Sequence, residues 1–238
     1  MGTARRFSRI LHREIDVHAA WLPVTNTFRL GDYGMVSDGV LVKMGNIDEF
    51  GVEFVPGAGR PAELQFRSDG TKVRRVVGGA EAPSFPQVDL GAEIVIDFKA
   101  ADSIYISANL VSEEMQNVAQ VGAALRNAGG WRRRYRVVSS VYSAEHCTMI
   151  SAREANSRIT ISGTADALRL LELGRAHADV TVSSEESLGL NLAGRSGVVG
   201  LRMFTLRALG GGTRLLNADT DEQDLVEHVV DEDLTDDI

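Results

Sequence analysis

Residues 92–110 carry the pattern that most restricts how this chain can fold. Apolar and polar side chains alternate from Ala92 to Lys99, and the alternation resumes from Ser103 to Val111 after a short polar turn. A period of two in both halves, with a turn between them, predicts a β-hairpin with one apolar face. The side chains of this face are Ile94, Ile96, Phe98, Ile104, Ile106, Ala108 and Leu110.

The rest of the chain predicts an α+β fold, in which a twisted antiparallel β-sheet carries several packed helices. Helical apolar spacing is found over Thr3–Val17, Ser112–Ala128 and Ala165–Leu173. Further strands are expected as a hairpin within residues 62–78 around Ser68-Asp69-Gly70, as a strand over Tyr135–Tyr142, and as a second long hairpin over residues 188–206 that turns at Gly194–Gly197.

The composition is that of one ordinary globular domain. With 238 residues the chain can bury a substantial core. It has no run of about 18 apolar residues and no signal-peptide pattern, so no transmembrane helix or secretion is expected. The single cysteine, Cys147, excludes an internal disulfide and fits a reducing cytoplasm. The histidines lack zinc-binding spacing, and we expect neither a metal nor another cofactor.

The charge is divided unevenly between the body and the C-terminus. The formal net charge is −8, but residues 215–238 hold ten acidic and no basic side chains, which leaves the rest mildly basic. We therefore divide the chain into a folded body, residues 1–209, and a glycine-rich hinge with an acidic tail, residues 210–238. Apolar side chains in the tail recur at helical spacing: Leu225, Val226, Val229 and Val230.

Two groups of basic residues are candidate membrane-binding sites. The first lies on one side of the N-terminal helix and consists of Arg5, Arg6, Arg9 and Arg13. The second follows Trp131 and consists of Arg132, Arg133 and Arg134. An anionic membrane surface attracts such groups. The alternative for the helix alone, which is the commoner case, is a surface helix packed on a sheet.

Several segments, taken in order, resemble the pore-forming domain of the gasdermin family. They are Phe7–Asp16, Leu22–Thr25, Tyr33–Val36, Leu41–Lys43, Ala92–Tyr142, Val180–Ser183 and Ser187–Leu192. The first two resemble the family's basic amphipathic helix and the hydrophobic-Pro-Val-Ser/Thr step that follows it. The large helical inhibitory domain of animal gasdermins is missing, so the chain is similar to the compact microbial members with a short C-terminal inhibitory peptide. Position 2 is Gly, whereas some of those members acylate an N-terminal Cys.

The resemblance implies a non-enzymatic effector that is inactive in the cytoplasm and forms pores in the cell inner membrane. A protease would release the tail, and the body would bind anionic lipids and oligomerise into a membrane β-barrel that causes cell death, as in antiviral defence. Lipid would then contact Ile94, Ile96, Phe98, Ile104, Ile106 and Leu110. Arg214 is the candidate cleavage site, because it follows accessible glycines and is the last basic residue before the acids. No nucleic-acid partner is expected.

Two other functions stay open on the sequence alone. The chain could be a non-enzymatic interaction module whose acidic tail binds a basic partner. It could also be a hydrolase that uses His146 or Cys147, although adjacent strand residues point to opposite faces.

Overall fold

Two β-sheets and three α-helices make up the part of the chain that the structure describes. The structure is a computed structural model, and it describes residues 3–37, 39–87, 90–172, 180–184, 188–206 and 213–215. One sheet has nine strands and the other has five, and almost all neighbouring strands are antiparallel. The α+β fold class predicted from the sequence is therefore confirmed.

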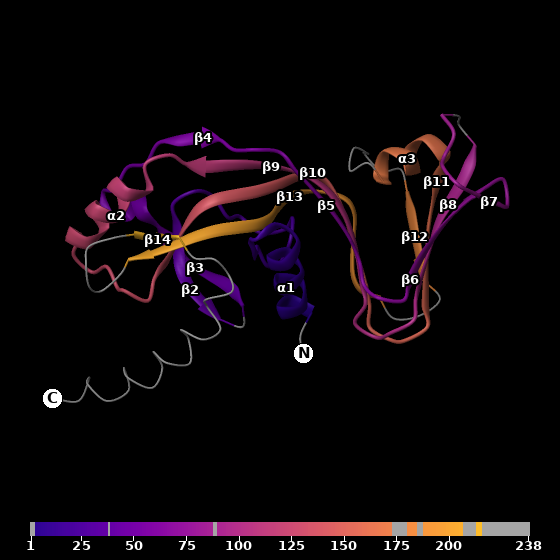
Figure 1. The fold of residues 1–238 in the computed structure, drawn as a ribbon, viewed down its shortest axis with the longest axis horizontal. Helices are drawn as coiled ribbons and strands as arrows, with labels where there is room; N and C mark the ends of the chain where they lie inside the picture. Colours follow the sequence, from indigo (N-terminus) through magenta and orange to yellow (C-terminus); the bar gives the residue numbers. More distant parts are fainter. Residues whose placement is uncertain are drawn as a thin grey trace.

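The two sheets are built from different strands, and short turns lead from strands of one sheet into strands of the other. The nine-stranded sheet contains β1 (His18–Ala19), β2 (Asp32–Ser37), β3 (Val40–Asn46), β4 (Pro56–Ala58), β5 (Ala62–Arg67), β9 (Ile104–Met115), β10 (Arg136–Ala152), β13 (Leu188–Leu206) and β14 (Thr213–Leu215). The five-stranded sheet contains β6 (Thr71–Val77), β7 (Ala80–Ala82), β8 (Gly91–Phe98), β11 (Ser157–Thr164) and β12 (Thr181–Ser184). Figure 1 shows β9, β10 and β13 crossing the molecule and bending towards the turns that lead into the five-stranded sheet.

Helix α1 (Thr3–Ile15) forms because its apolar residues share one side, as the sequence predicts. Phe7 and Leu11 are fully buried on this side. They pack in one core with Leu64 of β5 and Met149 of β10, so α1 covers one face of the nine-stranded sheet. Helix α3 (Ala165–Glu172) also lies where the sequence predicts a helix. A short 3-10 helix (Ile47–Phe50) follows β3.

Five strands of the large sheet close into a ring. β2 pairs with β3 and β10, β10 pairs with β13, β13 pairs with β1, and β1 pairs with β3. A core that includes Leu41, Val138, Leu201 and Met203 fills this ring. Closure leaves these strands without open edges at this end of the sheet, which protects them from pairing with other chains.

The predicted hairpin over residues 92–110 is wrong. β8 and β9 do not pair, because β8 lies between β6 and β11 in the small sheet and β9 pairs with β10, β4 and β5 in the large sheet. The hairpin predicted around Ser68-Asp69-Gly70 fails in the same way, since β5 and β6 also belong to different sheets. Alternation identifies the apolar face, which is buried, although Val95, Tyr105 and Ser107 of the other face are buried too, and it does not fix which strand is the neighbour.

The second predicted hairpin, over residues 188–206, is also wrong. β13 is one strand of 19 residues that pairs along its length with β10, which has 17 residues. Gly197, which the sequence suggested as part of a turn, pairs with Ala144 inside the ladder. It has φ +144°, and a Cβ there would lie 2.5 Å from the carbonyl oxygen of Val24. The glycine thus allows a close backbone approach rather than a reversal.

One helix boundary differs from its prediction. The helix expected from Ser112 begins later, because β9 continues to Met115 and α2 (Val118–Asn127) follows. Val121 and Leu125 of α2 pack in a core with Phe204 of β13. At the other end, β14 pairs with β13 beyond the predicted boundary at residue 209, and the described chain ends at Leu215.

We expect Gly197→Ala to lower the free energy of unfolding by more than about 1 kcal/mol, because it strains a positive-φ position and crowds Val24. Chemical denaturation would measure this. Gly129→Ala is the matched control, since no atom lies within 4 Å of the position that its Cβ would take. Equal stabilities of the two variants would contradict the close approach at Gly197.

Candidate functional site: two strands folded back on themselves

The structure divides the predicted membrane-inserting residues between two cores. Ile94, Ile96 and Phe98 of β8 lie in a core with α3 and β11. Ile104, Ile106 and Leu110 of β9 lie in the core under α1. All six side chains are at most 1% exposed, so the resting fold covers the whole predicted face, but with two different sets of neighbours.

The two central strands of the small sheet continue into the two central strands of the large sheet without a change of register. Phe98 of β8 lies opposite Ser157 of β11, and Ile104 of β9 lies opposite Ser151 of β10. Five residues separate the paired positions on each strand, namely Lys99–Ser103 and Ala152–Asn156, where Ala152 is also the last residue of β10, and we name these two segments the paired turns. Within them the backbone N–H of Ala152 donates to the carbonyl of Ser103 at 3.0 Å, which continues the ladder. β8–β9 and β11–β10 are therefore one long antiparallel pair that is folded in the middle.

The alternation is also in phase through the paired turns. In extended backbone, every second residue from Ile94 to Leu110 faces the same side, and this set holds all six predicted inserting residues. We call this side the apolar phase. In the structure it faces the α3 core on β8 and the α1 core on β9. Each turn contains one residue in the left-handed region, Asp102 with φ 57° and Asn156 with φ 60°.

Helix α3 holds the small sheet against the large one. Leu168 and Leu171 are fully buried against β8 and β11. At its C-terminus the Glu172 carboxylate accepts a hydrogen bond from Arg75 Nε of β6 at 2.9 Å, and the Glu172 carbonyl accepts one from Ser107 Oγ of β9 at 2.9 Å. We name these two bonds the α3 contact. The bond to Glu172 raises the pKa of Arg75, and burial raises the pKa of the neighbouring Tyr105 hydroxyl. A cavity of about 160 Å³ lies beside the contact.

The outer face of the small sheet is polar. Asp97 of β8 bridges its two neighbours, with Arg74 Nη2 of β6 at 2.8 Å and Arg158 Nε of β11 at 2.7 Å. Burial tends to raise the pKa of Asp97, but the hydrogen bonds from Arg158 and Arg74 outweigh it and hold the pKa below its usual value. This bridge joins three adjacent strands on the face opposite the apolar core.

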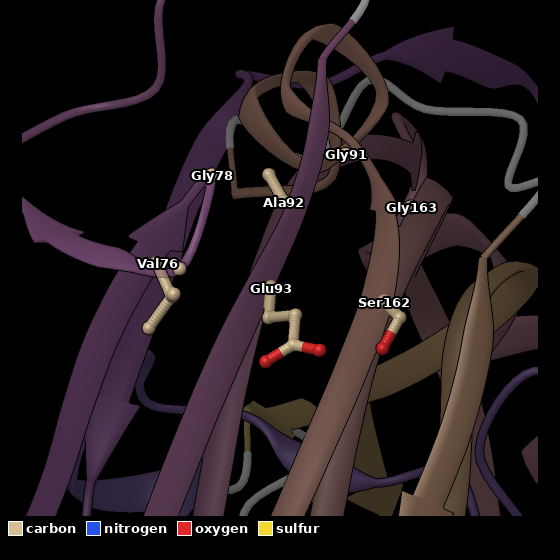
Figure 2. A pocket seen from close by; sticks show the side chains of 8 residues that line it. Val76, Gly78, Gly91, Ala92, Glu93, Ser162 and Gly163 are labelled. Atoms are coloured by element: carbon tan, nitrogen blue, oxygen red, sulfur yellow. The ribbon is translucent and has the colours of Figure 1, made fainter.

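A pocket of about 280 Å³ lies farther along the same outer face. Val76, Glu93 and Ser162 line it from three neighbouring strands, and Figure 2 shows the Glu93 carboxylate between the other two side chains. Glycines form much of the rest of the lining: Gly78, Gly79, Gly91 and Gly163. Glu93 is exposed, so the pocket offers one solvated carboxylate and little apolar surface.

The two predicted membrane-binding groups lie apart. Helix α1 lies below the middle of the long strands, whereas α2, which precedes the second group in the chain, lies at the end far from the small sheet (Figure 1). Arg5, Arg9 and Arg13 are exposed, and Arg6 is half-buried. In the second group Arg132, Arg133 and Arg134 are exposed, but the Trp131 ring packs at 5.4–5.6 Å from the rings of Phe50, Tyr135 and Tyr33.

The remaining candidate residues are placed only in part. The backbone of Arg214 pairs with Thr205 in an edge strand, and the tail residues Leu225, Val226, Val229 and Val230 lie outside the described residues. Cys147 is fully buried, and burial raises the pKa of its thiol to about 12, so it cannot act as a thiolate nucleophile near neutral pH. The side chain of His146 also lies outside the description.

Sequence reasoning missed the α3 contact. Arg75 and Glu172 are far apart in the chain, and nothing in either local pattern points to the other residue. It also missed the shared register, although the equal lengths of the two turns are visible once the strands are aligned. In the described part of the chain, no helix is long and apolar enough to cross a membrane, and no group of three or more His, Cys, Asp or Glu side chains could hold a metal ion.

Comparison with known proteins gives matches among solved structures. No protein-family model and no curated protein sequence matches the chain. The chain is similar to the cryo-EM structure of the gasdermin A3 membrane pore, with 9% sequence identity and a TM-score of 0.38 over 92% of this chain and 96% of that one. It is also similar to a bacterial gasdermin from Bradyrhizobium tropiciagri, with 16% identity and a TM-score of 0.37 over 88% and 90% of the two chains. Both belong to the family that the sequence resembles.

We expect Asp97→Asn to destabilise the protein by about 1–3 kcal/mol at pH 7, since it removes a carboxylate that two guanidinium groups stabilise. The folded pKa of Asp97 is depressed, so its contribution is present above the unfolded pKa of about 3.9 and is lost as the pH falls through the folded value. Denaturation at several pH values should therefore show that the difference in the free energy of unfolding between variant and wild type shrinks below about pH 4. Glu93→Gln, at an exposed site on the same strand, is the control. A difference that stays constant down to pH 2 would contradict the assignment.

Proposed function

We propose that the chain is a gasdermin-like pore-forming effector whose long central strands straighten and insert into a membrane. The observation that carries this proposal is the unshifted register of β8–β9 with β11–β10 through the paired turns. An ordinary pair of stacked sheets has no need for turns of equal length and matching phase in two neighbouring strands. A strand pair that must also form one straight, continuous ladder needs turns of equal length and a matching alternation of side chains.

Straightening would give the strands the properties of a membrane β-barrel. Only helices and closed barrels satisfy the backbone hydrogen bonds in lipid. A spanning strand needs about 9–11 residues, with apolar side chains on the lipid side and polar ones towards water. The apolar phase offers six candidate lipid-facing residues, which are Ile94, Ile96, Phe98, Ile104, Ile106 and Leu110, and the length of a single membrane crossing would decide how many of them contact lipid. The outer face with Glu93 and Asp97 would supply the water-filled side.

The same residues explain why the resting form would not straighten in water. Each of the six side chains is buried, and full burial of such a side chain stabilises by about 1.5–3 kcal/mol. Exposing all of them would cost on the order of 10 kcal/mol. Lipid removes this cost because it covers the apolar phase again, and neighbouring subunits of an oligomer pair the strand edges. Membrane contact and oligomerisation are therefore coupled to the change in shape.

Docking on anionic lipid would precede insertion. Arg5, Arg9 and Arg13 are exposed on α1, and Arg132–Arg134 are exposed after α2, where Trp131 anchors their loop to the aromatic cluster. Each basic group near an anionic surface contributes about 1 kcal/mol, and salt screens the attraction. Because α1 also covers the core that contains Ile106, lipid binding at α1 acts on an element that touches the strands.

The acidic tail is proposed to inhibit the body until a protease removes it. Residues 215–238 carry ten acids and no base, and the body is otherwise slightly basic. Leu225, Val226, Val229 and Val230 would cover apolar surface, while the acids meet exposed arginines. Cutting near Arg214 would leave the tail held by noncovalent contacts only. Arg214 pairs in an edge strand, so a protease would need this strand to open first. The inactive form would be cytoplasmic, and the active form would act at the cell inner membrane to cause cell death in antiviral defence.

We expect the full chain, carrying an engineered protease site between residues 216 and 220, to release dye from anionic liposomes only after cutting. Arg5→Glu, Arg9→Glu and Arg13→Glu together should reduce this release by about tenfold or more at low salt, because they reverse the attraction to lipid. Arg60→Glu, at another exposed arginine, is the control.

A synthetic peptide of residues 216–238 should suppress the release, and a version with serine in place of Leu225, Val226, Val229 and Val230 should not. Cut protein that binds liposomes or other anionic surfaces without any leakage would disprove pore formation and would favour the interaction module.

We expect the α3 contact to set how quickly the strands are released. Arg75→Glu places two carboxylates together, so it should shorten the lag before dye release after cutting. The combined Arg75→Glu and Glu172→Arg variant restores opposite charges and should restore the lag, as stopped-flow fluorescence would record. Equal lags in all three proteins would show that α3 does not limit the change.

A further inference from the structure

The apolar phase carries one charged residue on each of the two central strands. On β8–β9 the phase runs Ile94, Ile96, Phe98, Ala100, Asp102, Ile104, Ile106, Ala108, Leu110. On β11–β10, in the same order, the residues that lie opposite Ile94 to Ala108 run Ile161, Ile159, Ser157, Ala155, Arg153, Ser151, Met149, Cys147, and Ala144 lies opposite Leu110. Asp102 and Arg153 are thus the charged residues in two otherwise uncharged rows, and their charges are opposite.

Extending the register through the paired turns would place these two residues directly across from each other in a straight ladder. Ser151 pairs with Ile104, the next backbone bond joins Ala152 to Ser103, and the position after that is Arg153 opposite Asp102. From the other side the same register, with Phe98 opposite Ser157, leads to the same pairing. The pairing of Asp102 with Arg153 therefore follows from the β9–β10 ladder and also from the β8–β11 ladder.

In the resting fold the left-handed backbone at position 102 favours Asp or Asn, but it does not require a charge, and no such constraint applies to Arg153. Both side chains are exposed in the paired turns. Within the described part of the chain, neither takes part in an ion pair. Other charged residues lie in the same turns or in the adjacent turn between β5 and β6, namely Lys99, Glu154 and Asp69. The turns thus form a band of charged residues between the apolar residues of β8 and those of β9.

We propose that Asp102 and Arg153 form an ion pair in the inserted state, and that this pair lies at the membrane surface. This rests on the proposed function and makes it more specific. Charges on the lipid side of a barrel strand are costly near the middle of the bilayer and cost little at its interface. Opposite charges directly across an antiparallel ladder attract each other. The pair is therefore tolerated at the surface, where it also marks the depth to which the strands enter.

The strand lengths fit this depth. β8 and β11 have 8 residues each, so with one or two turn residues they reach the roughly 9–11 residues that a membrane crossing needs. The full apolar phase from Ile94 to Leu110 is about twice too long for one crossing. Only the half with Ile94, Ile96 and Phe98 would then contact lipid. Ile104, Ile106 and Leu110 would stay under α1, as they are in the resting fold.

A charge-reversal cycle in the full chain with the engineered protease site tests the pair. Asp102→Arg and Arg153→Asp should each reduce the rate of dye release by roughly three- to tenfold after cutting. The double variant should return to within about twofold of wild type, since the pair is restored in the opposite sense. The thermal midpoint of uncut Arg153→Asp should not change, because this side chain is exposed, whereas Asp102→Arg should lower the midpoint slightly, because Arg tolerates left-handed backbone less well than Asp. Glu53→Arg, at an exposed site remote from the strands, is the control.

Depth is measured with a fluorescent thiol label at Asp102→Cys and lipid quenchers at known depths. The native Cys147 is buried and stays unlabelled in the folded protein. The label should be quenched by headgroup-level quenchers, whereas a label at Val111→Cys, which is also exposed at rest, should lie outside the membrane.

Two results would overturn the inference: a label at position 102 that lies near the bilayer centre, or single variants that release dye as fast as wild type. In either case, dye release by the wild-type protein would still support pore formation. Silent wild-type protein would instead remove the proposed function itself.

Discussion

The unshifted register between β8–β9 and β11–β10 is the constraint on which the rest of this structure depends. Because the two strands pair identically on both sides of the paired turns, neither can slip without moving its apolar side chains out of both cores. The flanking strands are less constrained, since β5 and β6 meet β9 and β8 in registers that differ between the sheets. The central pair is therefore the part of the molecule that fixes where its neighbours lie.

The resting fold covers one apolar face in two separate ways. Under the large sheet, Phe7 and Leu11 of α1 cover Ile106 and its neighbours. In the small sheet, Leu168 and Leu171 of α3 cover Ile94 and Ile96. Polar contacts then fix α3 in position, since its last residue bonds to both sheets through Arg75 and Ser107. Two small helices thus cover the apolar face that lipid would cover in the proposed straight strand pair, and under that proposal the helices would control the change.

The sequence predicted the buried faces of strands and helices better than it predicted which strands pair with each other. The stripe of α1 and the alternation from Ile94 to Leu110 identified buried side chains correctly, because burial follows from local spacing. Strand pairing does not follow from local spacing, so the local pattern predicts hairpins at the turns Ser68–Gly70 and Lys99–Ser103, although each turn leads into a different sheet. Gly194 and Gly197 suggested a turn because a glycine needed for a close approach has the same local signal as one needed for a reversal. Contacts such as Arg75 with Glu172 join distant segments, and no local pattern reveals them.

The turns themselves bear on the direction of the proposed change. Asp102 and Asn156 hold left-handed backbone in the folded strand pair, with φ 57° and 60°. L-residues other than glycine disfavour this conformation by about 1–2 kcal/mol, although Asp and Asn tolerate it better than most. In an extended ladder both residues return to the β region, so straightening releases this cost in both strands together. In water the two cores oppose straightening, because exposing their apolar side chains would cost far more free energy than the turns would gain from the relieved backbone. Once lipid covers the apolar phase, the cores no longer oppose it, and the remaining backbone preference of the turns favours the straight form.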